Sequence, residues 1–229
     1  MVDDVVEVSE PGSFLAGLGV EERSALSGLG RRHRWRRGAV LCSQDEVSRW
    51  VALLDSGSVK ASVHTRDGGE ILLGIQGSGS LIGGPEAADG RPRLATIAAL
   101  EPVEALVVPR PVFLVFLHEH DRAMWLLMDS VCRQLRDADR ARVAFVSTDV
   151  PGRLAQLLVD LAERYGQRDE RGLRISLALT QHELASWVGA SREAVSATLG
   201  ALRARGWIET GRRIVVVRDL TALREAGYR

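Results

Sequence analysis

Short apolar runs alternate with polar turns over about residues 34–109, which is the pattern of a β-rich domain. The turns combine glycine with polar residues, as in Asp55-Ser56-Gly57 and Arg66-Asp67-Gly68-Gly69. Short strands at regular spacing favour a β-sandwich or roll. We expect short helices within residues 11–30 to cover one end of it. The predicted strands are Val51–Leu54, Val59–Val63, Ile71–Ile75, Ala95–Leu100 and Leu106–Val108.

Apolar residues recur at helical spacing between about residues 111 and 150, where glycine is absent, and one long helix is predicted there. Seven positions follow alternating intervals of four and three residues, as in a two-stranded coiled coil. A helix of about thirty residues extends about 45 Å. We therefore expect two subunits to share it in a parallel homodimer through residues 119–149, although a single long core helix is the alternative. The seven positions are Met124, Met128, Val131, Leu135, Ala138, Arg142 and Phe145, of which only the arginine departs from the apolar pattern.

A second domain is predicted to begin at Val150-Pro151-Gly152, where proline and glycine interrupt the helical pattern. Proline is tolerated in the first turn of a helix, so a new helix is expected over Arg153–Tyr165. A polar loop at Gln167–Arg171 and a strand at Leu173–Ser176 follow. The predicted fold class is α+β. Its parts are a β-roll over residues 1–118, a long helix over 119–149 and a C-terminal domain over 150–229.

Residues 180–199 have the pattern of a helix-turn-helix. Thr180 and Glu183 form a capping box that begins the first helix. Gly189 supplies the left-handed backbone conformation that a tight interhelical turn needs, and Ser191 caps the second helix. The apolar positions of the second helix are Val195, Leu199 and Leu202.

The second helix is predicted to read DNA bases, because Arg192 and Glu193 are its first polar residues. Arginine suits guanine O6 and N7, and glutamate accepts from cytosine N4. Residues 206–217 indicate two strands around an arginine-bearing turn, the wing of a winged helix. A helical hairpin packed on a β-hairpin with solvated arginines is the alternative. The candidate DNA-contacting residues are Thr180, Gln181, His182, Ser191, Arg192, Glu193, Ser196 and Arg212, with the hydroxyls of Thr180 and Ser191 placed for phosphate.

Charge divides the chain near the predicted domain boundary. The 229 residues carry 30 basic and 30 acidic side chains. Residues 1–150 hold 17 basic and 21 acidic residues (net −4), and residues 151–229 hold 13 and 9 (net +4). Positive charge in the domain with the helix-turn-helix favours a nucleic-acid partner. All basic residues except Lys60 are arginine, which a GC-rich genome explains as easily as phosphate recognition.

Composition excludes several functional classes. Apolar residues make up 45% and charged residues 26%, and the apolar runs fall far short of the roughly 20 residues of a membrane helix. With no secretory pattern at residues 1–8, we expect a cytoplasmic protein without a membrane partner. Cys42 and Cys132 are too few for a disulfide framework or a four-thiolate iron–sulfur cluster, and no metal site is predicted. We find no nucleophile–base pair or catalytic carboxylate pair, so an enzyme is not expected.

Four segments of the C-terminal domain resemble the cyclic-AMP receptor protein / fumarate-nitrate regulator (CRP/FNR) family. The β-roll motifs Asp55-Ser56-Gly57-Ser58-Val59-Lys60, Gly68-Gly69-Glu70 and Gly79-Ser80-Leu81-Ile82-Gly83 follow that family's order more weakly. The resemblance implies a homodimeric transcription regulator with a cyclic-nucleotide-binding-like roll, a two-fold related DNA site and RNA polymerase as a further partner. The four segments are Asp149-Val150-Pro151-Gly152-Arg153-Leu154-Ala155, Leu179-Thr180-Gln181-His182-Glu183-Leu184-Ala185, Val188-Gly189-Ala190-Ser191-Arg192-Glu193-Ala194-Val195 and Gly206-Trp207-Ile208.

The resemblance also assigns base reading to Arg192 and Glu193. A third base-reading arginine of the family corresponds to Ala197 in this chain, which leaves the preferred half-site open. Ser196 or Gln181 would contribute in its place.

The effector pocket departs from that family's pattern. The family places a glutamate directly after a glycine, and later an arginine followed by serine or threonine. This chain has Gly84 after Gly83, and Leu94 after Arg93. On the long helix, Ala138 and Asp139 replace a threonine and a serine that contact the base in cAMP-responsive members. These six residues are the candidate effector pocket. We expect cAMP not to bind tightly, and another nucleotide or small effector, or none, to act instead.

Three alternatives remain open at this level. His118 and His120 would offer imidazoles to a haem, although a solvated helix start is the simpler explanation. The basic run at residues 31–37 indicates a solvated face or a contact with a partner. The competing function is a cyclic-nucleotide-type sensory module that acts through protein partners rather than DNA.

Overall fold

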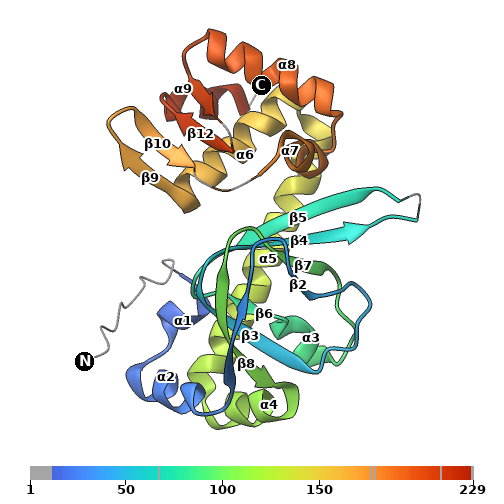
Figure 1. The fold of residues 1–229 in the computed structure, drawn as a ribbon, viewed down its shortest axis with the longest axis vertical. Helices are drawn as coiled ribbons and strands as arrows, with labels where there is room; N and C mark the ends of the chain where they lie inside the picture. Colours follow the sequence, from blue (N-terminus) through green and yellow to red (C-terminus); the bar gives the residue numbers. More distant parts are fainter. Residues whose placement is uncertain (1–11, 67, 176, 178, 212, 228–229) are drawn as a thin grey trace. The chain divides into compact units, whose positions relative to one another are not determined.

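The computed structural model describes residues 12–66, 68–175, 177, 179–211 and 213–227 (Figure 1). The chain divides into two compact units. The first comprises residues 1–69 and 73–136, and the second residues 70–72 and 137–229. In the described part of the chain, no helix is long and apolar enough to cross a membrane.

The first unit is built on two antiparallel sheets with strand orders β1-β8-β3-β6 and β2-β7-β4-β5. Residues on β3 alternate between two core clusters, with Val51 and Leu53 in one and Ala52 and Leu54 in the other, because successive side chains of a strand point to opposite faces. The five predicted strands are confirmed, and β1, β2 and β6 are additional. The strands are β1 Arg31–Trp35, β2 Val40–Cys42, β3 Trp50–Ser56, β4 Val59–His64, β5 Glu70–Gln76, β6 Leu81–Ile82, β7 Thr96–Ala99 and β8 Val103–Pro109.

Four helices and the first part of a longer one complete this unit, and three aromatic rings pack the first of the four against the last. Phe113 is fully buried, with its ring centroid 6.3 Å from that of Phe14 and 6.2 Å from that of Phe116. Leu117 and Leu127 belong to the same cluster. The helices are α1 Phe14–Gly17, α2 Val20–Ser27, α3 Gly84–Asp89 and α4 Arg110–Glu119.

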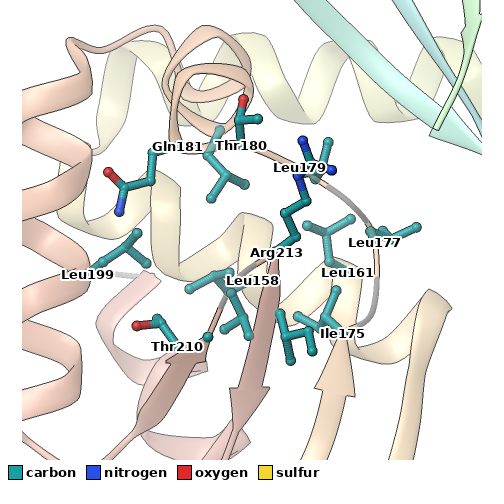
Figure 2. Close-up of a pocket in the computed structure, with 14 residues that line it drawn as sticks. Leu158, Leu161, Ile175, Leu177, Leu179, Thr180, Gln181, Leu199, Thr210 and Arg213 are labelled. Atoms are coloured by element: carbon teal, nitrogen blue, oxygen red, sulfur yellow. The ribbon is translucent and has the colours of Figure 1, made fainter. Parts of the chain in front are cut away.

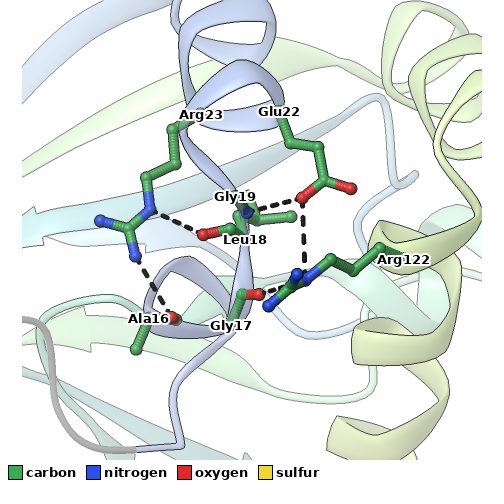
Figure 3. A network of polar contacts seen from close by, with 7 residues as sticks. All are labelled: Ala16, Gly17, Leu18, Gly19, Glu22, Arg23 and Arg122. Atoms are coloured by element: carbon green, nitrogen blue, oxygen red, sulfur yellow. Dashed lines mark hydrogen bonds and ion pairs between the residues drawn. The ribbon is translucent and has the colours of Figure 1, made fainter.

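Polar contacts fix the two N-terminal helices to the start of α5 (Asp121–Ser147), as Figure 3 shows. The Arg122 Nε atom donates to the Gly17 carbonyl oxygen at 2.7 Å. It also lies 3.9 Å from a carboxylate oxygen of Glu22, which accepts from the Gly19 N–H at 2.6 Å. The carboxylate therefore caps α2 while it faces the cation on α5.

The long helix expected over residues 119–149 is confirmed as α5, whereas residues 111–118, which were assigned to the same helical pattern, belong to a separate helix, α4. The break is at His120, whose φ of −130° and ψ of 87° are not helical. Its ring packs on Phe116 with centroids 4.5 Å apart. Asp121 in the first turn of α5 favours the new helix N-terminus electrostatically. Packing of α4 against the roll sets the direction of the chain before α5 begins.

The second unit packs helices against a sheet with strand order β11-β12-β10-β9 (Figure 1). Leu154 and Leu158 of α6 and Leu223 of α9 are buried. The helix that was predicted to begin at residue 153 begins at Val150. The predicted polar loop at residues 167–171 includes most of the strand β9, and the helix α9 was not predicted. The elements are α6 Val150–Tyr165, β9 Gly166–Asp169, β10 Gly172–Ile175, α7 Gln181–Val188, α8 Arg192–Ala204, β11 Ile208–Gly211, β12 Ile214–Val217 and α9 Leu220–Gly227.

Candidate functional site

The capping box predicted at the start of α7 is confirmed. The Thr180 hydroxyl oxygen accepts from the Glu183 N–H at 3.2 Å, and the Glu183 carboxylate accepts from the Thr180 N–H at 2.8 Å. The same carboxylate lies 2.9 Å from the Thr180 hydroxyl and accepts its proton. Two N–H groups that would otherwise lack partners are satisfied. Thr180 is exposed, but its hydroxyl proton is already engaged.

The turn between α7 and α8 requires Gly189, as predicted from its position. Its φ is +63°, and a Cβ atom there would lie 2.8 Å from the Phe145 ring. The Arg153 guanidinium lies 5.0 Å from the centroid of that ring, and Arg153 Nε donates to the Val188 carbonyl oxygen at 2.8 Å. Arg153 and Phe145 were not predicted to support this turn, because both lie far from Gly189 in the chain.

The recognition helix α8 begins at the predicted cap, where the Ser191 hydroxyl oxygen accepts from the Ala194 N–H at 3.2 Å. The predicted apolar positions Val195, Leu199 and Leu202 are buried. Thr198 is buried with them and was missed. Its hydroxyl donates to the Ala194 carbonyl oxygen at 2.8 Å, as threonine commonly does inside a helix.

The first turn of α8 presents Arg192 and Glu193 to solvent, with Ser196 exposed one turn further on. Within the described ranges, neither Arg192 nor Glu193 has an ion-pair partner. Gln181 and His182 at the start of α7 are exposed as well. The predicted contacts therefore lie at the surface where the two helices begin, free for a partner.

The predicted wing is confirmed as the hairpin of β11 and β12, in which Gly211 pairs with Ile214. Arg212 lies outside the described residues. Arg213 is exposed and has a left-handed φ of +61°, which places it in the tight turn at the tip.

The arginine of the candidate effector pocket is buried. Arg93 is 2% exposed, and its guanidinium lies 4.5 Å from the centroid of the Trp50 ring. Nη2 donates to the Trp50 carbonyl oxygen at 2.5 Å, and the buried Nη1 has no hydrogen-bond partner among the residues that the structure describes. A Cβ atom on Gly83, whose φ is +77°, would lie 1.6 Å from Nη1. The arginine is thus enclosed between Gly83 and Trp50, a partner that the motif comparison did not identify.

Gly84 leaves no space for the glutamate that the family pattern has at this position. A Cβ atom on Gly84 would lie 2.7 Å from side-chain carbons of both Leu127 and Leu81. Leu94 is 69% exposed, and its N–H donates to the Glu86 carboxylate at 3.3 Å. Leu94 thus presents an apolar side chain to solvent, and a side chain at position 84 would meet Leu127 and Leu81.

The predicted positions on α5 form an exposed stripe. Met124 is 43% exposed, Met128 52% and Leu135 62%. Ala138 and Asp139, assigned to the candidate effector pocket, are exposed on the part of α5 that belongs to the second unit.

Cys42 and Cys132 are both free thiols. Burial is the main cause that raises the pKa of the Cys42 thiol above its ordinary value, while Arg93 opposes the shift. Among the residues that the structure describes, no three histidine, cysteine, aspartate or glutamate side chains are grouped to hold a metal ion. His118 and His120 lie at the end of α4, and the His120 ring packs on Phe116 at a tilt.

Comparison with known proteins agrees with this architecture. Residues 32–120 match the family model of the cyclic nucleotide-binding domain, and residues 152–226 match that of the Crp-like helix-turn-helix domain. The chain is 31% identical to the CRP-like cAMP-activated global transcriptional regulator of Mycobacterium tuberculosis, over 86% of this chain and 90% of the relative. It is 28% identical to the cyclic AMP receptor protein of Thermus thermophilus, over 93% and 95% of the two chains.

A solved structure of a CooA mutant from Carboxydothermus hydrogenoformans has a TM-score of 0.76 at 25% identity. The similarity covers 93% of this chain and 94% of that one. This structural similarity and the two family-model matches together include the roll, the long helix and the winged helix-turn-helix. The chain is therefore a member of the CRP/FNR family of transcription regulators, with a cyclic nucleotide-binding domain followed by a Crp-like helix-turn-helix domain.

Proposed function

We propose that the protein is a homodimeric, sequence-specific DNA-binding regulator whose activity does not depend on cAMP. The observation that carries the proposal is the first turn of α8, where Arg192 and Glu193 are exposed side by side. A helix N-terminus with unpaired polar side chains suits the edges of bases in a major groove. Ser191 retains its hydroxyl proton for a phosphate, because in its cap the hydroxyl acts as an acceptor.

The homodimer is supported by the apolar stripe on α5. Leu135 and Met128 are more than half exposed at heptad spacing, and a second copy of the helix would bury them. Two recognition helices related by a two-fold axis then fit half-sites about 34 Å apart. The preferred DNA would be a palindrome.

Independence from cAMP is supported by the enclosed Arg93 and by the absence of space at Gly84. The regulator from M. tuberculosis is named as cAMP-activated. In this chain, the Arg93 guanidinium, which would meet a cyclic phosphate, already contacts the Trp50 ring and donates to the Trp50 carbonyl oxygen. A nucleotide would have to displace them, so cAMP is not the expected effector.

Selection of binding sites from random duplex DNA, with and without cAMP, tests the proposal. We expect one palindrome, recovered equally in both conditions. A palindrome recovered only with cAMP would contradict the assignment of the pocket. Recovery of no motif in either condition would contradict DNA binding by the free protein and favour a sensory module that acts through protein partners.

The Arg192→Ala variant is expected to lose about 1–3 kcal/mol of binding free energy for the selected palindrome and to relax specificity at one base pair in each half-site. Fluorescence anisotropy with the palindrome and its single-base variants measures both effects. Arg168→Ala is the matched control, because Arg168 is exposed on β9 of the same unit and outside the recognition helix. Unchanged base preference in Arg192→Ala would show that this arginine does not read DNA.

A further inference from the structure

The second unit contains a cavity of about 140 Å³ next to the recognition helix and the wing (Figure 2). Leu158 and Leu161 of α6, Ile175 of β10 and Leu199 of α8 form much of its wall, and all four are buried. Protein interiors are close-packed, and voids larger than a water molecule are few. Its volume is similar to that of an enclosed engineered cavity of about 150 Å³ that binds benzene, but this cavity opens to the surface between exposed residues.

The edge of the cavity is polar where it meets the surface. Thr180, Gln181, Thr210 and Arg213 line it there. The hydroxyls of the two threonines are already engaged, with Glu183 and with Arg203 respectively. Arg213 has no ion-pair partner within the described part of the chain, and Figure 2 shows its side chain extending from the wing toward Leu179. An apolar cavity with one unpaired cation at its edge is complementary to a small molecule with an apolar body and an anionic head.

We propose that this cavity binds a small aromatic carboxylate, with the ring among the leucines and the carboxylate on Arg213. A single ring matches the volume, and a guanidinium presents paired donors to a carboxylate. The site is distinct from the candidate effector pocket, because every residue that lines it belongs to the second unit.

Occupation of the cavity would weaken DNA binding, a consequence that rests on the proposed function. Leu199 belongs to the recognition helix, and Gly211 and Arg213 belong to the wing, so one ligand contacts both DNA-binding elements. A carboxylate that pairs with Arg213 holds this cation away from a DNA phosphate. The slope of log affinity against log salt would then fall by about one for each wing arginine removed from phosphate.

Benzoate is the probe, titrated into the full chain and followed by NMR chemical shifts, with sodium chloride replaced to hold the ionic strength constant. We expect saturable shifts with a Kd of about 10 mM or tighter. Benzyl alcohol, a neutral analogue, should bind the wild-type protein about three- to fivefold more weakly than benzoate does. Benzoate should bind the Arg213→Gln variant more weakly than wild type by about the same factor. Arg168→Gln, which removes the same charge elsewhere in this unit, should bind like wild type.

The Val215→Phe variant tests the cavity itself, because this half-buried residue lines it and a larger ring would fill it. It should abolish benzoate binding while retaining the circular dichroism spectrum of the wild-type protein. Absence of saturation in wild type, or binding retained by a folded Val215→Phe variant, would overturn the proposal. Benzoate binding is measured without DNA, and palindrome binding without benzoate, so a failure of the cavity proposal is distinguished from a failure of the proposed function.

Discussion

A Gly84→Glu variant is expected to lose about 3 kcal/mol or more of the unfolding free energy of the first unit. The substitution restores the glutamate of the family pattern, but the Cβ atom alone would approach Leu127 and Leu81 to 2.7 Å. Overpacking of a core costs about 1–3 kcal/mol, and a carboxylate forced among leucines loses its hydration without a partner. The residue that would supply a ribose contact therefore disrupts the packing of α3 instead.

Urea unfolding followed by circular dichroism measures this loss, with Gly74→Glu as the control. A Cβ atom on Gly74 has nothing within 4 Å, so the same added side chain and charge should cost much less there. Equal midpoints for the two variants would contradict the packing argument. So would a Gly84→Glu protein that remains as stable as wild type and gains cAMP binding.

The helix-turn-helix could be predicted residue by residue because its determinants are local. Thr180 bonds to Glu183, Ser191 bonds to Ala194, and Gly189 needs only its own backbone conformation. Each interaction spans a few residues, so the sequence order contains it. The exposure of Arg192 and Glu193 follows from the same helical periodicity.

The start of the long helix was predicted to within two residues of Asp121, but the separate helix α4 before it was not, because neither glycine nor proline marks the break at His120. His120 leaves the helical conformation where its ring packs on Phe116, beside the aromatic cluster around Phe113. This packing depends on Phe14, which is about a hundred residues away in the chain. Similarly, β9 is polar throughout and becomes a strand through its pairing with β10.

The effector pocket was predicted in part. The motif comparison identified Gly84 and Leu94 as departures, and the structure gives the physical reason at Gly84, which is the approach of Leu127 from α5. Trp50 was not identified as the partner of Arg93, because the contact joins β3 to a loop 43 residues later. The burial of an arginine against an indole ring and a carbonyl oxygen cannot be inferred from local sequence.

The Leu135→Glu variant is expected to be monomeric at micromolar concentration and to lose at least about 10³-fold in affinity for the selected palindrome. Leu135 is 62% exposed on α5, so its replacement should leave the fold of each subunit intact. In the proposed dimer, the two-fold axis would bring two such glutamates together in an apolar seam, where like charges repel without hydration. A monomer can occupy only one half-site, and affinity falls toward the non-specific level.

Sedimentation velocity and palindrome binding measure the two effects, and Gln134→Glu is the matched control. Gln134 is exposed and outside the heptad positions, so it receives the same charge without entering the seam. Leu135 is a better position for the substitution than Phe145, the last residue of the stripe, because Phe145 already packs on Gly189 and Arg153 within its own subunit. If Leu135→Glu remained dimeric with wild-type affinity, the α5 stripe would not be the dimer interface. If it were monomeric and still bound the palindrome fully, binding would not require two linked recognition helices.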